Sequence, residues 1–282
     1  MMTQDKIAEL VDQVPALDKR GTFTGTTWEE ALPIFDGVLA AGRGGVIAVV
    51  AMLKDIDDGA DYKARYVLHG IAQYVGRPGK DTARALFIDA LASQLGGELP
   101  KGAQGYVARQ LQVIGSKDSA PALGRLLADP ELCEYAAQAL LAIRAGAVEQ
   151  FRKALPDLQG GLRLTVLQAL GVLADAESAD AFKKALGDAD LDHRLAGAWG
   201  LARIGDATSA DPVAKMATAA ATEGWEAIKA TAAALLLAEN LLAAGNKAVA
   251  ARIYKQLLSN RAEGSRAYLE EVAAEGLRKA GG

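Results

Sequence analysis

Histidine and cysteine are the side chains best suited to metal binding or nucleophilic chemistry, and this chain of 282 residues has few of them. Its two histidines, His69 and His193, are far apart in the sequence and are followed by Gly70 and Arg194. Two lone histidines make a poor ligand set for zinc or iron. A packed or helix-capping role is the better interpretation of each. We therefore expect no metal and no other cofactor.

The single cysteine, Cys133, excludes an intrachain disulfide and fits a reducing compartment. No basic residue adjoins it, so we interpret it as a small buried apolar side chain and not as a reactive thiol. No Gly-x-Ser-x-Gly nucleophile motif occurs. Segments 42–45 and 77–80 combine glycine with basic residues but lack the phosphate-loop pattern, so we expect interhelical turns there. These absences predict that the chain is not an enzyme.

The composition favours helices in a protein without a membrane segment. Alanine and leucine dominate and aromatic residues make up 5%, a mixture with high helix propensity. The formal net charge of −4 argues against nucleic acid as a partner, because binders of nucleic acid usually carry a basic surplus. The N-terminus has no apolar signal core, and the most apolar stretch, 44–53, is too short to span a bilayer. We expect a cytoplasmic protein, although a chain whose signal peptide had been removed would read the same.

An internal repeat organises most of the chain. Five segments align without gaps and end at residues separated by 39, 29, 30 and 31 positions, namely Val75, Ile114, Ile143, Leu173 and Ile204. Each repeat holds two stretches, such as 119–129 and 131–145, with apolar residues at steps of three and four. That spacing predicts pairs of amphipathic helices. The expected fold class is all-α.

The segment from Asp190 to Gly205 resembles the second-helix signature of the HEAT-repeat family, and Arg163 to Leu173 is close to it. The resemblance implies a right-handed α-solenoid of about seven helix pairs with extra N-terminal helices. We expect residues 1–43 to cap an array over 44–282, whose stretch 238–254 is also similar to a tetratricopeptide pair. Gln104 and Cys133 stand where the family has arginine, which implies an interrupted ladder of Asp–Arg pairs.

The remaining elements can be placed coarsely. We expect helices over 3–14, 28–40, 222–243, 247–258 and 264–279, and a loop over 21–27. The column three positions before each segment's end should be core: Ala72, Leu111, Leu140, Leu170 and Leu201. The column six positions before the end should pack between helices: His69, Ala108, Ala137, Leu167 and Ala198.

Columns one, five and eight positions before the segment ends should face away from the core. Aromatic residues and arginine are typical of binding hot spots. We therefore predict a concave groove for a peptide or protein partner. Its residues are Tyr74, Tyr106, Arg109, Tyr135, Gln138, Gln168, Trp199 and Arg203, with Val113 and Thr165 in the same columns. The alternative is that these side chains only fill crevices between repeats.

The resulting prediction of function is a non-catalytic scaffold or adaptor that binds a protein or peptide. One alternative is a HEAT-type DNA glycosylase, for which Trp199, Arg203, Asp206 and Trp225 are candidate residues. Another is a HEAT-type bilin lyase or chaperone that holds a tetrapyrrole, for which the sequence offers no dedicated motif. Self-association through the ends of the array is a further alternative.

Overall fold

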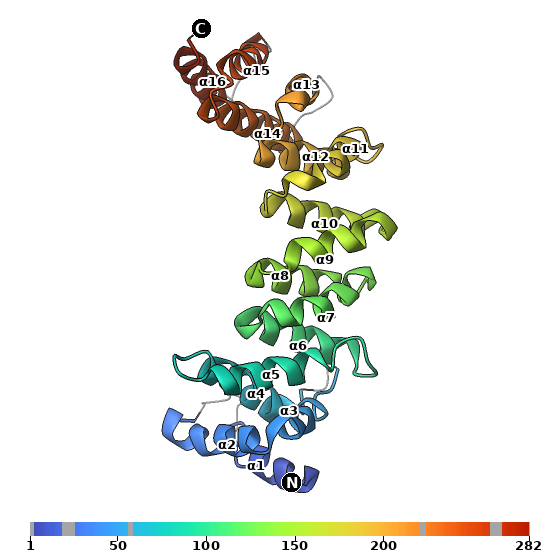
Figure 1. Cartoon of the computed structure of the whole chain (residues 1–282), viewed down its shortest axis with the longest axis vertical. Helices are drawn as coiled ribbons and strands as arrows, with labels where there is room; N and C mark the ends of the chain where they lie inside the picture. The colour runs from blue at the N-terminus through green and yellow to red at the C-terminus, as the bar shows by residue number, and fades with distance from the viewer. Residues whose placement is uncertain (1–2, 19–25, 56–58, 220–223, 260–266, 282) are drawn as a thin grey trace. The chain divides into compact units, whose positions relative to one another are not determined.

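A computed structural model of the chain describes residues 3–18, 26–55, 59–219, 224–259 and 267–281. Within these ranges all regular structure is helical and no β-strand occurs, which confirms the all-α fold class. The chain divides into two compact units, residues 1–154 and 155–282, and each is a stack of helices (Figure 1). The boundary predicted between residues 43 and 44 lies inside a helix, Gly42–Val50.

Unit 1 is a two-layer stack in which the helices follow one another in chain order (Figure 1). One layer is built by α4, α6 and α8, each packed on the next, and the other contains the contacts α3 with α5 and α7 with α9. The helices are α1 (Gln4–Asp12), α2 (Trp28–Ala40), α3 (Gly42–Val50), α4 (Tyr62–Val75), α5 (Asp81–Ala92), α6 (Lys101–Ile114), α7 (Ala120–Gly124), α8 (Cys133–Ile143) and α9 (Ala147–Ala154).

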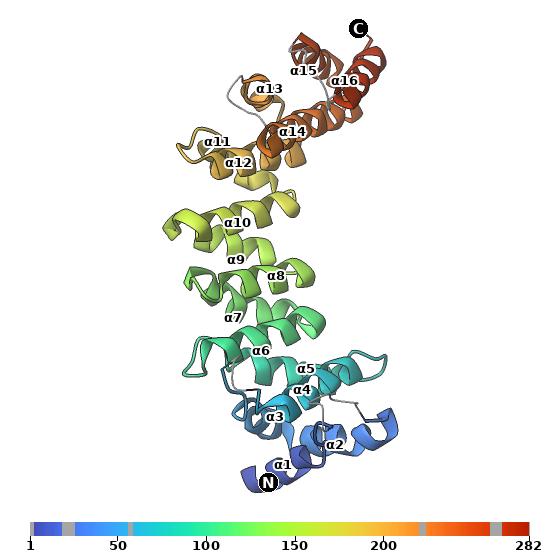
Figure 2. The ribbon, with the colours of Figure 1, turned by 180° about the vertical axis from the view of Figure 1, so that it is seen from behind.

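Unit 2 repeats this plan with longer helices toward its C-terminal end (Figure 2). Here α10, α12 and α14 pack on one another in succession, while α11 packs on α12 and α13 on α15. The helices are α10 (Gly160–Val172), α11 (Ala179–Leu186), α12 (Leu191–Ile204), α13 (Ala210–Thr218), α14 (Gly224–Ala243), α15 (Lys247–Ser259) and α16 (Ala267–Lys279). Short 3-10 turns precede several of them, for example Ala176–Ser178 before α11.

Local sequence explains where individual helices begin. Helix α2 spans the residues predicted for it, because Thr27 and Glu30 form a capping box: the Thr27 hydroxyl accepts from the Glu30 amide at 3.3 Å, and the Glu30 carboxylate accepts from the Thr27 amide at 2.9 Å. The expected helices 247–258 and 3–14 are also observed, within two residues at each end. Parts of the expected elements 21–27, 222–243 and 264–279 lie outside the described residues.

The predicted core column is confirmed, since Ala72, Leu111, Leu140, Leu170 and Leu201 are all fully buried. The gapless alignment, however, is wrong by one residue in its first segment. His69, which it placed with the buried column six before the end, is exposed, whereas the neighbouring Leu68 is fully buried.

If the first aligned segment ends at Tyr74 instead of Val75, the buried and exposed positions of α4 agree with those of the other repeats. Gly70 then aligns with Gly200, and each of these glycines lies against a phenylalanine ring: an added Cβ would be 2.1 Å from Phe35 and 2.4 Å from Phe182. These close approaches fix the rotation of each helix about its axis more directly than apolar spacing does.

Acid–base pairs link some of the successive repeats, including one beside Gln104, where the family resemblance implied an interruption. Asp129 is bound by Lys101, and Asp188 by Arg163 at 2.8 Å. Gln104 instead holds the turn before α6, where its side-chain oxygen accepts from the Gly96 amide at 2.8 Å and its amide donates to the carbonyl of Leu99. Lys101 thus supplies a pair close to Gln104, Arg163 supplies one from the family position itself, and Cys133, which cannot form an ion pair of this kind, interrupts the ladder as the resemblance implied.

Over the described ranges, no single helix is both long and apolar enough to be a candidate membrane span. Helices α2 and α3 reach that length and apolarity only when taken together, and they are bent by 115° at the break between them.

Candidate partner-binding surface

The layer formed by the second helices of each repeat exposes one regular column of side chains. With the corrected register, the position five before the segment end is exposed in every aligned repeat. Its residues are His69, Arg109 and Gln138 in unit 1, and Gln168 and Trp199 in unit 2. Four of these five were predicted from the sequence, and His69 replaces the buried Gly70 that the gapless alignment put there.

In unit 1 the predicted tyrosines are largely used in packing between repeats. The Tyr106 hydroxyl donates to the Arg65 carbonyl at 2.5 Å, and the Arg65 guanidinium lies 4.8 Å from the centre of the Tyr106 ring. Burial raises the pKa of Tyr106 well above its usual value. Tyr135 lies against Gly105, where an added Cβ would be 3.0 Å from the ring. These two side chains fill crevices between repeats, as the alternative interpretation of the columns predicted.

Tyr74, also predicted for the groove, belongs to the core. It is 9% exposed, its hydroxyl accepts from Lys80 Nζ at 2.6 Å, and its ring packs edge-on against Trp28 at 6.4 Å. The misregistered first segment explains this error, because Tyr74 occupies the position of a buried residue such as Ile114.

In unit 2 the exposed column borders a cavity of about 340 Å³ between α10, α12 and α14. Two predicted groove residues, Gln168 and Trp199, line it. The rest of its wall is mainly apolar and was not predicted: Val172, Leu195, Ala196 and Ala232, with Asp192 and Lys229 as charged members. The volume falls in the range of protein ligand pockets, about 300–1,000 Å³.

Large apolar side chains stand exposed around this cavity. Val172 is 46% exposed, Trp199 39%, Trp225 52% and Ile228 48%. Trp225 and Ile228 precede the cavity residues Lys229 and Ala232 at helical spacing on α14, so they share one face of that helix. We call these four residues the tryptophan face. In the sequence, the helical spacing of residues 225, 228, 229 and 232 could have indicated that they share one side of α14.

Two basic side chains near this cavity interact with neighbouring residues in different ways. Lys229 Nζ lies 4.2 Å from the centre of the Trp225 ring, a cation–π contact. Arg203, predicted as a groove residue, donates to the carbonyls of Gly171 and Val172 at 3.3 and 3.2 Å and so satisfies the C-terminal end of α10. Arg203 thereby links α12 to α10 beside the tryptophan face.

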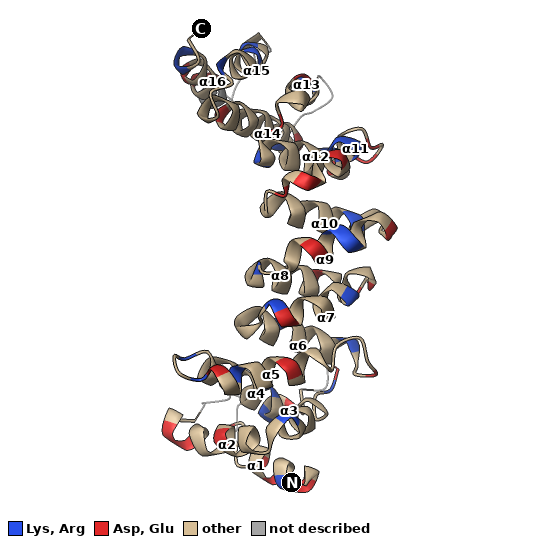
Figure 3. Cartoon of the chain, viewed as in Figure 1, with Lys and Arg blue, Asp and Glu red and all other residues tan. Residues whose placement is uncertain are grey.

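Asp206, one of the residues proposed for a glycosylase-like cluster, is engaged by neighbouring side chains. Asp206 accepts from the Ser209 hydroxyl at 2.5 Å and from the Thr208 hydroxyl, and it pairs with Lys183 at 3.4 Å. These bonds engage its carboxylate at the turn before α13, where it holds the 3-10 segment Ala207–Ser209. Charges of both signs are interspersed along the helices of each unit (Figure 3).

The two histidines have different environments. His69 is exposed and lies 3.0 Å from Gln110 Oε1 and 2.8 Å from Gln73 Nε2. His193 is 7% exposed; its Nδ1 lies 2.9 Å from the carboxylate of Asp190, the N-cap of α12. In the described part of the chain, no group of three or more His, Cys, Asp or Glu side chains could hold a metal ion.

Cys133 is buried, as predicted, at the first turn of α8. Burial, helped by the charges of Glu134 and Asp129, raises the pKa of its thiol to about 11. We expect the native chain at pH 8 to react with Ellman's reagent about a hundredfold more slowly than the urea-unfolded chain, because only the thiolate attacks. Equal rates in the two states, measured by absorbance, would contradict the burial of this thiol.

Comparison with known proteins gives likenesses of fold at low sequence identity. No protein-family model and no curated protein matches the sequence significantly. A crystal structure of an engineered protein aligns over 99% of this chain and 79% of its own, with 20% identity and a TM-score of 0.48. The complex of CpcE and CpcF of phycocyanin lyase from Nostoc sp. aligns over 93% and 96%, with 18% identity and a TM-score of 0.37.

Human deoxyhypusine hydroxylase aligns over 99% of this chain and 96% of its own, with 16% identity and a TM-score of 0.30. The lyase and the hydroxylase have HEAT-like helical repeat folds. They also overturn one prediction made above. The inference that this chain is not an enzyme was wrong, since proteins named as a lyase and a hydroxylase are among the structures it resembles. The chain is a helical repeat protein, as the stacked helices of each unit show.

Proposed function

We propose that unit 2 binds a protein partner through the tryptophan face. The partner inserts an apolar side chain into the cavity between α10, α12 and α14. The observation that carries this proposal is the coincidence of four exposed large apolar residues with a cavity of about 340 Å³. Isolated exposed apolar side chains are ordinary, but a contiguous group around a hollow is typical of a binding surface.

The charges at the cavity define the partner's chemistry further. Lys229 and Asp192 both line it, on α14 and on the first turn of α12 respectively. A complementary segment would carry an acidic residue on one side of its apolar anchor and a basic residue on the other. We therefore propose an extended or helical peptide segment with this pattern as the partner.

A library of random peptides displayed on phage and selected on the full chain tests the proposal. We expect enriched peptides to carry a large apolar residue flanked by opposite charges. Trp199→Ala should weaken the binding of a selected peptide at least about tenfold, because exposed tryptophans at the centre of an interface are frequent hot spots. Fluorescence anisotropy of the labelled peptide measures the dissociation constant.

Gln138→Ala is the matched control, because Gln138 occupies the same repeat position in unit 1 and is also exposed. This variant should bind the peptide like the unaltered chain. Failure of the library to yield a saturable binder, or a binder indifferent to Trp199→Ala, would refute the proposed face.

A further inference from the structure

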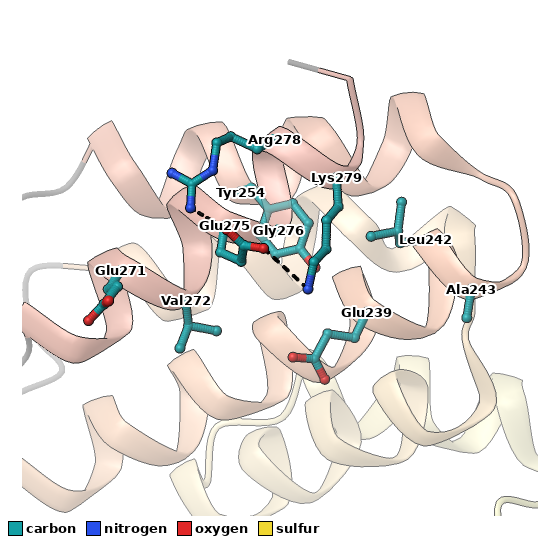
Figure 4. Close-up of a pocket in the computed structure, with 10 residues that line it drawn as sticks. All are labelled: Glu239, Leu242, Ala243, Tyr254, Glu271, Val272, Glu275, Gly276, Arg278 and Lys279. Carbon is teal, nitrogen blue, oxygen red and sulfur yellow. Dashed lines mark hydrogen bonds and ion pairs between the residues drawn. The ribbon is translucent and has the colours of Figure 1, made fainter.

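A second cleft lies in unit 2 between α14, α15 and α16, with a volume of about 640 Å³ (Figure 4). Its apolar wall includes Leu242 of α14 and Val272 of α16. Helix α16 sits directly on the ring of Tyr254, because an added Cβ at Gly276 would be 2.3 Å from that ring. The cleft is separate from the tryptophan face, and none of the residues lining one lines the other.

The Tyr254 hydroxyl is the first sign that the cleft accepts a ligand. The residue is 1% exposed and lines the cleft, yet its hydroxyl makes no hydrogen bond to any part of the chain that the structure describes. The ring is buried, but the hydroxyl oxygen is not one of the fully buried unpaired atoms, so it opens onto the cleft. In Figure 4 the hydroxyl end of the ring points toward the space between Lys279 and Glu239. A polar group bound there would satisfy it.

The distribution of charge is the second sign. Three carboxylates line the cleft, from Glu239, Glu271 and Glu275. Only Glu275 forms an ion pair among the described residues, with Arg278 and with Lys279 at 3.4 Å. Glu239 and Glu271 therefore present carboxylates to the cleft that no basic side chain of the described chain neutralises. Their charge favours a cationic ligand.

Lys279 shows which kind of cation fits. Its alkyl chain reaches across the cleft, so that its ammonium group lies beside Glu275 and faces Glu239 (Figure 4). The side chain of Lys279 is 64% exposed, and ion pairs this exposed contribute little free energy. A ligand of the same chemistry could displace it at small cost.

We propose that this cleft binds an alkylammonium group, either a lysine side chain of a partner or a free aliphatic amine. The alkyl part lies along Leu242 and Val272, and the ammonium donates to Tyr254 Oη and to the carboxylate of Glu239, while Glu271 adds negative charge at the other end of the cleft (Figure 4). Burial and the charge of Glu239 raise the pKa of Tyr254, so the phenol keeps its proton and its oxygen accepts from the ammonium. This inference does not depend on the tryptophan face.

Titration of the full chain, labelled with nitrogen-15, tests the proposal by NMR. Three probes are compared: hexylamine, its neutral analogue hexanol, and the peptide acetyl-Ala-Lys-Ala-amide. We expect saturable shifts of the Gly276 and Leu242 amides with an amine, and at least about tenfold weaker binding of hexanol. Binding of hexylamine alone identifies a free amine as the ligand, and stronger binding of the peptide identifies a protein partner. No saturable shift with either amine, or equal binding of hexanol, overturns the proposal.

Two glutamates give a matched pair of variants. Glu239 lines the cleft and faces the ammonium of Lys279, whereas Glu270 does not line it (Figure 4). We expect Glu239→Gln to weaken amine binding about three- to fivefold and Glu270→Gln to leave it unchanged. Tyr254→Phe, which removes only the hydroxyl, should also weaken it, and Lys279→Ala should strengthen it by removing the resident ammonium. Equal effects of the two glutamate variants would contradict a specific site.

Discussion

Gly197→Ala is expected to destabilise unit 2 by about 3 kcal/mol or more, at the upper end of the cost of overpacking. An added Cβ at this position of α12 would lie 2.5 Å from the Leu186 amide nitrogen and 2.6 Å from the Phe182 carbonyl oxygen, both on α11. Backbone atoms of a packed helix cannot move aside as a flexible side chain would. The substitution must therefore separate α11 from α12. Urea unfolding followed by tryptophan fluorescence measures the effect, since Trp199 and Trp225 both lie in unit 2.

Gly161→Ala provides the control for this prediction. Gly161 lies in α10, and an added Cβ there would have no atom within 4 Å. Alanine has a higher helix propensity than glycine by about 1 kcal/mol, so this variant should be as stable as the unaltered chain or more stable. Equal destabilisation by both substitutions would show that close packing of α11 on α12 is not the cause.

Leu170→Ala is expected to cost about 2–5 kcal/mol of unfolding free energy, the range for deletion of a large core side chain. Leu170 is fully buried in α10 and belongs to the core column that recurs in each aligned repeat. In a repeat stack the loss acts on the interfaces with the neighbouring helices, so the transition of the whole unit should shift. The midpoint of urea denaturation reports this change.

Val172→Ala is the comparison for Leu170→Ala, because Val172 lies two residues later in the same helix and is 46% exposed. We expect it to change the free energy of unfolding by less than about 1 kcal/mol. An unchanged midpoint for Leu170→Ala would refute the assignment of this column to the core.

Most of the fold follows from regular features of the sequence. Apolar residues at steps of three and four, recurring every 29 to 31 residues over four segments, predict the helix pairs and the buried column that contains Leu111, Leu140 and Leu170. Capping chemistry at Thr27 and Glu30 fixes the start of α2. These features depend on residues close together in the sequence, so the folded chain keeps the helices that they predict.

The first repeat shows where such signals fail. Apolar residues of α4 occur on most of its sides, so their spacing tolerates a shift of one residue. Gly70 decides the register through its contact with Phe35, which lies 35 positions earlier. A contact between distant residues leaves no periodic trace in one sequence. The error moved Tyr74 from the core to the predicted surface.

The candidate site could be predicted only in part for a related reason. Column counting identified Gln168 on α10 and Trp199 on α12, and both line the cavity. It missed Lys229 and Ala232, because α14 is a 20-residue helix that the aligned repeat does not cover. The cleft at Tyr254 was also missed, since it depends on how α16 packs on α15 and on the resulting open space beside α14.

Fluorine NMR of the chain labelled with fluorotryptophan can show whether a partner binds at the tryptophan face. The chain has three tryptophans, Trp28, Trp199 and Trp225, and single Trp→Phe variants assign their three resonances. When a peptide selected from the library is added, we expect the resonances of Trp199 and Trp225 to shift to saturation with one dissociation constant, while that of Trp28 stays in place. A bound peptide that shifts only Trp28, or none of the three, would contradict a partner-binding surface on α10, α12 and α14.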